Sequence, residues 1–80
     1  MKTTASIYEI KLLLKEHGYQ FNRWWRIPTS VGTLTNSRLG GWPGMELSIS
    51  GGQWRTCHML RNMSGADLAV IYNALVEDQS

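Results

Sequence analysis

Cys57 and His58 are neighbours in the sequence, and a thiol beside an imidazole is the pairing from which a nucleophilic catalyst is built. The imidazole has to take the proton of the thiol, so the two side chains must point toward each other. Alternating residues around this pair predict a strand, and consecutive residues of a strand point to opposite faces. We therefore expect no proton transfer between them. We interpret Cys57 as a small packed side chain and His58 as a histidine at the core or its rim.

Other catalytic and metal-binding patterns are missing from the sequence. Its metal-binding residue types are one cysteine, two histidines and six acidic residues, with no C-x-x-C or H-x-x-x-H spacing. It contains no G-x-S-x-G elbow, and the glycine-rich run 40–44 lacks the residue order of a phosphate-binding loop. The sequence therefore predicts a protein that is not an enzyme and that holds no metal or cofactor.

Arginine and tryptophan gather in the middle of the chain. Residues 17–62 contain all five arginines and all four tryptophans, against a single acidic residue, Glu46. The two types are interleaved in residues 23–26, Arg-Trp-Trp-Arg, and in residues 54–55, Trp-Arg. Arginine binds phosphates and stacks on rings, and tryptophan stacks on bases or fills a pocket of a protein partner. The combination is typical of a recognition surface.

The direction of side chains along the predicted strands divides the tryptophans. Trp25 and Trp54 are in phase with apolar neighbours, which predicts that both lie in the core. Trp24 points to the opposite side. Trp42 lies in a Gly/Pro loop, where it covers the core edge or contacts a partner, and the arginines are either binding residues or plain solvated side chains. The candidate binding residues are Arg23, Trp24, Arg26, Arg38, Trp42 and Arg55.

Two classes of partner fit this surface. The first is RNA or single-stranded DNA, with arginines on phosphates and exposed tryptophans stacked on bases. The second is a protein, as for a small regulator or inhibitor encoded by a mobile element, with the same tryptophans as buried anchors. The net charge of +2 is low for a nucleic-acid-binding domain, whose basic residues are usually more numerous. We favour the nucleic-acid hypothesis and keep the protein-binding alternative.

The compartment follows from three features. No apolar run approaches the roughly 20 residues of a membrane span, and the N-terminus does not resemble a signal peptide. A single cysteine rules out an internal disulfide and suits a reducing environment. We therefore expect a cytoplasmic protein with no membrane partner.

The first element that must position these residues is a helix. Ser6 and Glu9 have the spacing of a capping box, and apolar residues then recur at helical intervals. Gly18 supplies a stop, because glycine readily adopts the left-handed conformation that follows a helix. The pattern predicts a helix over residues 7–17.

Extended segments follow. Apolar and polar residues alternate over residues 19–27, which predicts a strand that stops at Pro28. Residues 31–35 give a weaker strand signal. Alternation resumes over residues 45–50 and 53–58 around Gly51-Gly52, which predicts a hairpin with Ser50 opposite Gln53. In that register Leu47 lies opposite Thr56, so that one face of the hairpin is mostly apolar.

A second helix over residues 65–76 is predicted from Ser64 as its cap, Asp67 in its first turn and an apolar stripe. The elements predict one α+β domain spanning residues 1–80, with an antiparallel sheet of about three strands in α-β-β-β-α order. Both helices are expected to pack on one face of that sheet. The predicted core consists of Leu13, Leu14, Phe21, Trp25, Leu47, Ile49, Trp54, Leu68, Ile71 and Leu75.

Residues 6–19, Ser-Ile-Tyr-Glu-Ile-Lys-Leu-Leu-Leu-Lys-Glu-His-Gly-Tyr, resemble the first helix of HicA-type toxins. The resemblance covers less than a fifth of the chain. It implies a fold like that of double-stranded-RNA-binding domains, in keeping with the predicted α-β-β-β-α order. Those toxins cleave RNA with a histidine of a Gly-Ser-His motif, and this sequence contains no such motif, so their activity is not carried over.

Overall fold

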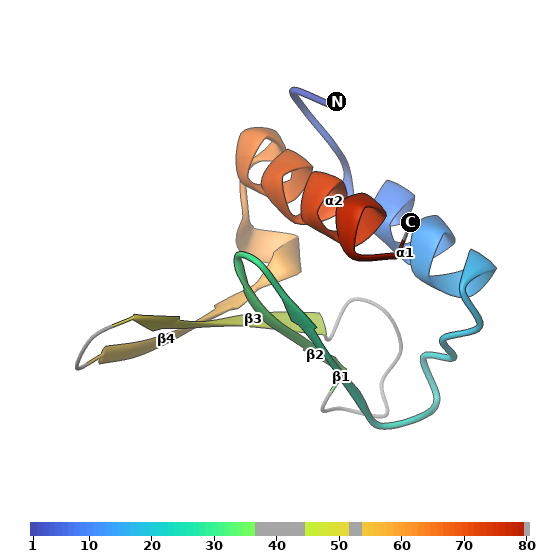
Figure 1. Ribbon diagram of the computed structural model, residues 1–80, viewed down its shortest axis with the longest axis horizontal. Coiled ribbons are helices and arrows are strands. Elements are labelled where there is room, and N and C mark those ends of the chain that lie inside the picture. The colour runs from blue at the N-terminus through green and yellow to red at the C-terminus, as the bar shows by residue number, and fades with distance from the viewer. Residues whose placement is uncertain (37–44, 52–53, 80) are drawn as a thin grey trace.

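The computed structural model describes residues 1–36, 45–51 and 54–79, and for residues 46, 48–51, 54–58, 78 and 79 it describes the backbone alone. The chain forms an α+β fold in which two helices lie on one side of a four-stranded antiparallel sheet (Figure 1). Its elements are α1 (Ile7–Glu16), β1 (Trp25–Thr29), β2 (Gly32–Asn36), β3 (Met45–Gly51), β4 (Trp54–Met59), the short 3-10 helix η2 (Leu60–Asn62) and α2 (Gly65–Gln79). None of the described helices is long and apolar enough to cross a membrane.

Helix α1 begins and ends as its sequence predicts. The Ser6 hydroxyl accepts a hydrogen bond from the backbone N–H of Glu9, and the Glu9 carboxylate accepts one from the backbone N–H of Ser6. After the last turn, Gly18 has a φ of +91°, a left-handed conformation that costs glycine little. Helix α2 is capped in a similar way, because the Ser64 hydroxyl accepts from the backbone N–H of Asp67. Both predicted helices are therefore confirmed, and α2 runs three residues further than expected.

The sheet has the order β1-β2-β3-β4, and every neighbouring pair is antiparallel. The expectation of about three strands is wrong, because the weak signal over residues 31–35 belongs to a full strand, β2. Strand β2 is central and pairs with both β1 and β3. Each pairing thus supplies a row of backbone hydrogen bonds that a segment rich in Gly and Thr would not gain alone.

The first predicted strand is also corrected. Strand β1 begins only at Trp25 and continues through Pro28 to Thr29, whereas a strand over residues 19–27 was expected. Proline lacks the backbone N–H that a strand residue can donate. Because β1 is an edge strand, the N–H at this position would point away from the neighbouring strand, so its absence breaks no hydrogen bond of the sheet. Residues 19–24 form turns and irregular backbone instead of a strand.

The hairpin of β3 and β4 forms in a register two residues away from the expected one. Gly51 pairs with Trp54, and Leu47 pairs with His58 instead of Thr56. A shift of two residues leaves every side chain on its original face, because the side-chain period of a strand is two. The hydrophobic pattern therefore could not distinguish the two registers. Residues 52 and 53, between the paired ends, lie outside the described residues.

The core lies between the sheet and the two helices. Of the predicted core residues, five are buried and three are partly buried against them, while the side chains of Ile49 and Trp54 lie outside the description. The five are Leu14, Leu47, Leu68, Ile71 and Leu75, and the three are Leu13, Phe21 and Trp25. Ile27 and Leu34 face the helices from β1 and β2, so the opposite face of the sheet is not part of this core.

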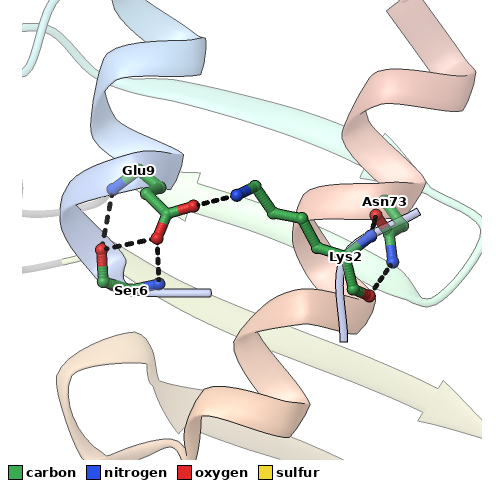
Figure 2. A network of polar contacts seen from close by, with 4 residues as sticks. All are labelled: Lys2, Ser6, Glu9 and Asn73. Atoms are coloured by element: carbon green, nitrogen blue, oxygen red, sulfur yellow. Dashed lines mark hydrogen bonds and ion pairs between the residues drawn. The ribbon is translucent and has the colours of Figure 1, made fainter. Parts of the chain in front are cut away.

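The N-terminal segment ties the two helices together (Figure 2). The side-chain amide of Asn73 in α2 accepts from the backbone N–H of Lys2 (3.1 Å) and donates to its carbonyl (2.9 Å). The Lys2 ammonium pairs with the carboxylate of Glu9 in α1 and lies over the ring of Tyr72, 5.1 Å from its centre. Residues 1–6 therefore connect the start of α1 to the middle of α2.

Candidate functional site

Three of the six predicted binding residues are fully described, and all three are exposed. Arg23 and Trp24 lie just before β1, and Arg26 lies within it. The Trp24 side chain is 67% exposed, which is unusual for a large apolar residue. Arg38 and Trp42 lie outside the described residues, and Arg55 is described by its backbone alone. The name Arg-Trp segment is used below for residues 23–26.

The two tryptophans of this segment have opposite roles, as their adjacent positions predict. The ring of Trp25 packs against those of Tyr19 and Phe21, with ring centres 5.3 Å and 5.8 Å away, and all three rest on the core. The indole N–H of Trp25 donates to the carbonyl of Gln20 (3.0 Å). Trp25 is only partly buried, because it covers the edge of the core. Trp24 is left on the surface while its neighbour anchors the backbone.

Asn36, at the end of β2, is a residue of this region that sequence reasoning missed. Its side chain is completely buried and lies directly across from Trp25 in the sheet. Its amide nitrogen donates to the carbonyls of Phe21 (3.0 Å) and Arg23 (2.7 Å). The available signal was the alternation of Leu34 and Asn36, which places a polar residue on the core face, where it must find hydrogen-bond partners. The predicted strand ended one residue too early to include it.

These contacts explain why residues 19–24 do not continue β1. In a strand, backbone carbonyls bond to a neighbouring strand, but here the carbonyls of Gln20, Phe21 and Arg23 accept from side chains or from a turn N–H. The backbone N–H of Arg23 donates to the carbonyl of Gln20 (3.2 Å), which closes that turn. The backbone that presents Trp24 is therefore held from two sides, by Trp25 and by Asn36.

The face of the sheet opposite the helices, called the outward face below, continues from the Arg-Trp segment. Arg26 pairs with Thr35, which pairs with Glu46, and Pro28 pairs with Thr33, which pairs with Ser48. These positions alternate with the core positions, so they belong to the outward face. By sequence these positions are an arginine, a proline, two threonines, a glutamate and a serine, and the pairing of β3 with β4 adds the positions of Cys57 and Met59 to the same face.

Arg55 shares this face with Arg26, because it pairs with Ser50, four residues along β3 from Glu46. Three strand spacings and four residues separate the two arginine positions, a distance of roughly 20 Å. The structure thus places Arg23, Trp24, Arg26 and the backbone of Arg55 along the sheet layer.

Charge is divided between the two layers. Of the described arginines, Arg26 and Arg55 lie in strands, Arg23 lies just before β1 and Arg61 lies in η2, whereas all three lysines lie in or before α1. Five of the six acidic residues lie in the helices, and only Glu46 belongs to a strand. The helical layer is therefore net negative and the sheet layer net positive, although the chain as a whole carries only +2.

Among the residues that the structure describes, the ion pair of Lys2 and Glu9 shifts the pKa values of both its partners. The hydrogen bond from the Lys2 ammonium, and its charge, lower the pKa of the Glu9 carboxyl against a smaller opposing effect of desolvation. The same hydrogen bond raises the pKa of Lys2. Both groups belong to the helical layer.

The described residues include no group of three or more His, Cys, Asp or Glu side chains that could hold a metal ion. A groove of about 490 Å³ lies between the β1–β2 turn, η2 and the start of α2. Its lining is mixed, with apolar residues such as Val31, Met63 and Val70 beside Ser64 and Asp67. Of the predicted binding residues, the three that are fully described, Arg23, Trp24 and Arg26, do not line it. The groove and the Arg-Trp segment are therefore separate features.

Comparison with models of protein families, with curated proteins and with solved structures found no match to this chain.

Proposed function

We propose that this chain binds single-stranded RNA or DNA through the Arg-Trp segment and the outward face of the sheet. The observation that carries the proposal is Trp24, which is 67% exposed between two exposed arginines on a backbone held by hydrogen bonds. An exposed indole costs free energy in water, and stacking on a base recovers it. Arginines beside the ring supply contacts to the flanking phosphates.

An unpaired base is required because a base in a duplex already stacks on its neighbours on both faces. Trp24 can stack only on a base that is free on one side, as in single strands and loops. The outward face carries no helix that could enter a major groove, because α1 and α2 lie on the other side of the sheet (Figure 1). Single-stranded ligands therefore fit this surface better than a duplex.

The division of charge supports the same surface. Phosphates are repelled by the acidic residues of the helical layer and attracted by the arginines of the sheet layer. The net charge of the whole chain, which argued against nucleic-acid binding, is low because the opposite charges of the two layers largely cancel. The proposed ligand therefore approaches the sheet layer, with its backbone running across the strands from Arg26 toward Arg55.

A protein partner that used Trp24 as an anchor would compete for the same surface, but a second candidate protein-binding site is the separate groove beside α2. Val70 on its rim is 52% exposed, and Leu47 and Ile71 contribute apolar surface deeper in the groove. An apolar side chain of a protein partner could fill such a groove. A regulator of this kind would depend on Val70 and be indifferent to Trp24, so the two functions are separable by mutation.

The test is the salt dependence of binding to fluorescently labelled single-stranded RNA and DNA, followed by anisotropy. Four arginine–phosphate contacts imply a slope of log affinity against log salt of about −3. The affinity should therefore fall ~50-fold when the salt concentration is raised from about 50 to about 200 mM. Arg26→Ala should flatten the slope by about 0.7, the share of one contact. Trp24→Ala should weaken binding by ~1–3 kcal/mol and leave the slope unchanged, because stacking releases no counterions.

Two control variants lie in the helical layer. Tyr8→Ala removes an aromatic ring that is 53% exposed on α1, and Lys15→Ala removes an exposed cation from the same helix. Both should bind like the wild type. A salt-independent signal, or no binding by folded protein at low salt, would contradict the proposal. Capture of a protein partner that is lost in Val70→Asp but kept in Trp24→Ala would favour the alternative.

A further inference from the structure

We propose that Asn36 is a positioning residue for ligand binding, which fixes the backbone of Arg23 and so holds Trp24 in the orientation that stacks on a base. The inference rests on the proposed function. Asn36 has no access to a ligand, because its side chain is completely buried, so it acts only through the segment that it holds.

The geometry of the amide sets this role. Both hydrogen bonds run from the Asn36 amide nitrogen, one to the carbonyl of Phe21 and one to that of Arg23. These carbonyls stand two residues apart, within the turn and bend over residues 21–23 that lead into Trp24. A group with two N–H bonds in one plane can span them, whereas a hydroxyl, with a single O–H, can serve only one. The bond to Arg23, at 2.7 Å, is the shorter and lies next to Trp24.

The side-chain oxygen of Asn36 does not explain why an asparagine occupies this position. Among the residues that the structure describes, no donor lies within hydrogen-bond distance of Asn36 Oδ1, although this atom is buried. A buried polar atom without a partner is costly. An apolar residue in phase with Leu34 would avoid that cost and pack against Met45 on the neighbouring strand. The donor function therefore accounts for an asparagine at this position.

Fixing the segment in advance strengthens binding without any new contact. A free loop would lose conformational freedom when Trp24 settles on a base, and that loss would weaken the complex. Because Asn36 and Trp25 hold the backbone, most of this loss of conformational freedom has already occurred when the protein folds. The contribution of Trp24 to affinity should therefore depend on Asn36, although the two side chains need not touch.

The experiment is a double-mutant cycle with Asn36→Leu, which has a similar branched shape but no donor. Affinity for labelled single-stranded RNA is measured for the wild type, Trp24→Ala, Asn36→Leu and the double variant. Trp24→Ala should weaken wild-type binding about 5- to 150-fold, the range for one lost base stack. In the Asn36→Leu background the same change should weaken binding less than about threefold, as expected for coupled residues.

Backbone relaxation measured by NMR gives a second readout that requires no ligand. The order parameter of the Trp24 amide should be near about 0.85 in the wild type and below about 0.6 in Asn36→Leu, with the strands unchanged. Asn73→Leu is the matched control, since it also removes an asparagine that bonds to backbone at two points, but in the helical layer. It should change neither the order parameter of Trp24 nor the affinity.

Additive effects in the cycle, or equal Trp24 order parameters in wild type and Asn36→Leu, would overturn the inference. If Asn36→Leu does not fold, Asn36→Ser is compared in the same way, because a single hydroxyl cannot hold both carbonyls. If the wild type binds no nucleic acid, the proposed function fails. The order parameters then still decide whether Asn36 positions Trp24.

Discussion

Trp25→Ala should be one of the most damaging substitutions in this protein, and Trp24→Ala one of the mildest. Trp25 donates a hydrogen bond to Gln20, which contributes about 1 kcal/mol. It makes two ring contacts, worth about 0.5–1.5 kcal/mol each, and burial of the rest of its surface adds roughly 1–2 kcal/mol. These contributions add to about 3–6 kcal/mol, which includes the usual range of about 3–5 kcal/mol for a large aromatic residue. Trp24→Ala should cost less than about 1 kcal/mol, as for an exposed site.

Urea unfolding followed by far-UV circular dichroism measures both losses. Trp25→Phe is the informative intermediate, because it keeps a ring against Tyr19 and Phe21 but removes the N–H donor, and it should lose about 1–2 kcal/mol. A domain of this size has a free energy of unfolding of only about 4–12 kcal/mol, so Trp25→Ala could unfold it completely. The stability of Trp25→Phe can be measured even in that case. If Trp24→Ala proves more damaging than Trp25→Ala, the assignment of core and surface sides around residue 25 is wrong.

Two further predictions concern α1. Glu9→Gln removes a carboxylate whose pKa is lowered in the folded state, so the stability that it contributes is present above the ordinary pKa of about 4.5 and is lost as pH falls through the folded-state value. The urea midpoints of Glu9→Gln and the wild type should therefore differ at neutral pH and converge in acid; a difference that stays constant with pH would contradict the role of the ion pair with Lys2. Gly18→Ala should cost about 1 kcal/mol because of its φ of +91° and not because of a clash, since no atom lies within 4 Å of the added Cβ. Gly18→Asn, which tolerates this conformation better, should cost less when both variants are compared by urea unfolding, and equal losses would point to another cause.

The local elements could be predicted from the sequence because their causes are local. The capping box at Ser6 and the glycine stop at Gly18 fix α1 through neighbours within a few residues, and Ser64 does the same for α2. Strand alternation likewise predicted that Trp24 and Trp25 face opposite ways. Exposure of Trp24, its flanking arginines and the α+β class follow from patterns that repeat over two to four residues.

The tertiary structure decided what depends on pairing between distant segments. A shift of two residues in the β3–β4 register keeps all faces the same, so only the assembled sheet selects Gly51 opposite Trp54. Strand β2 exists because β1 and β3 bond to it on both sides. Asn36 reaches carbonyls 13 and 15 residues away, which no local pattern encodes. The sequence thus determined the candidate binding residues, and long-range hydrogen bonds determined the backbone just before Trp24.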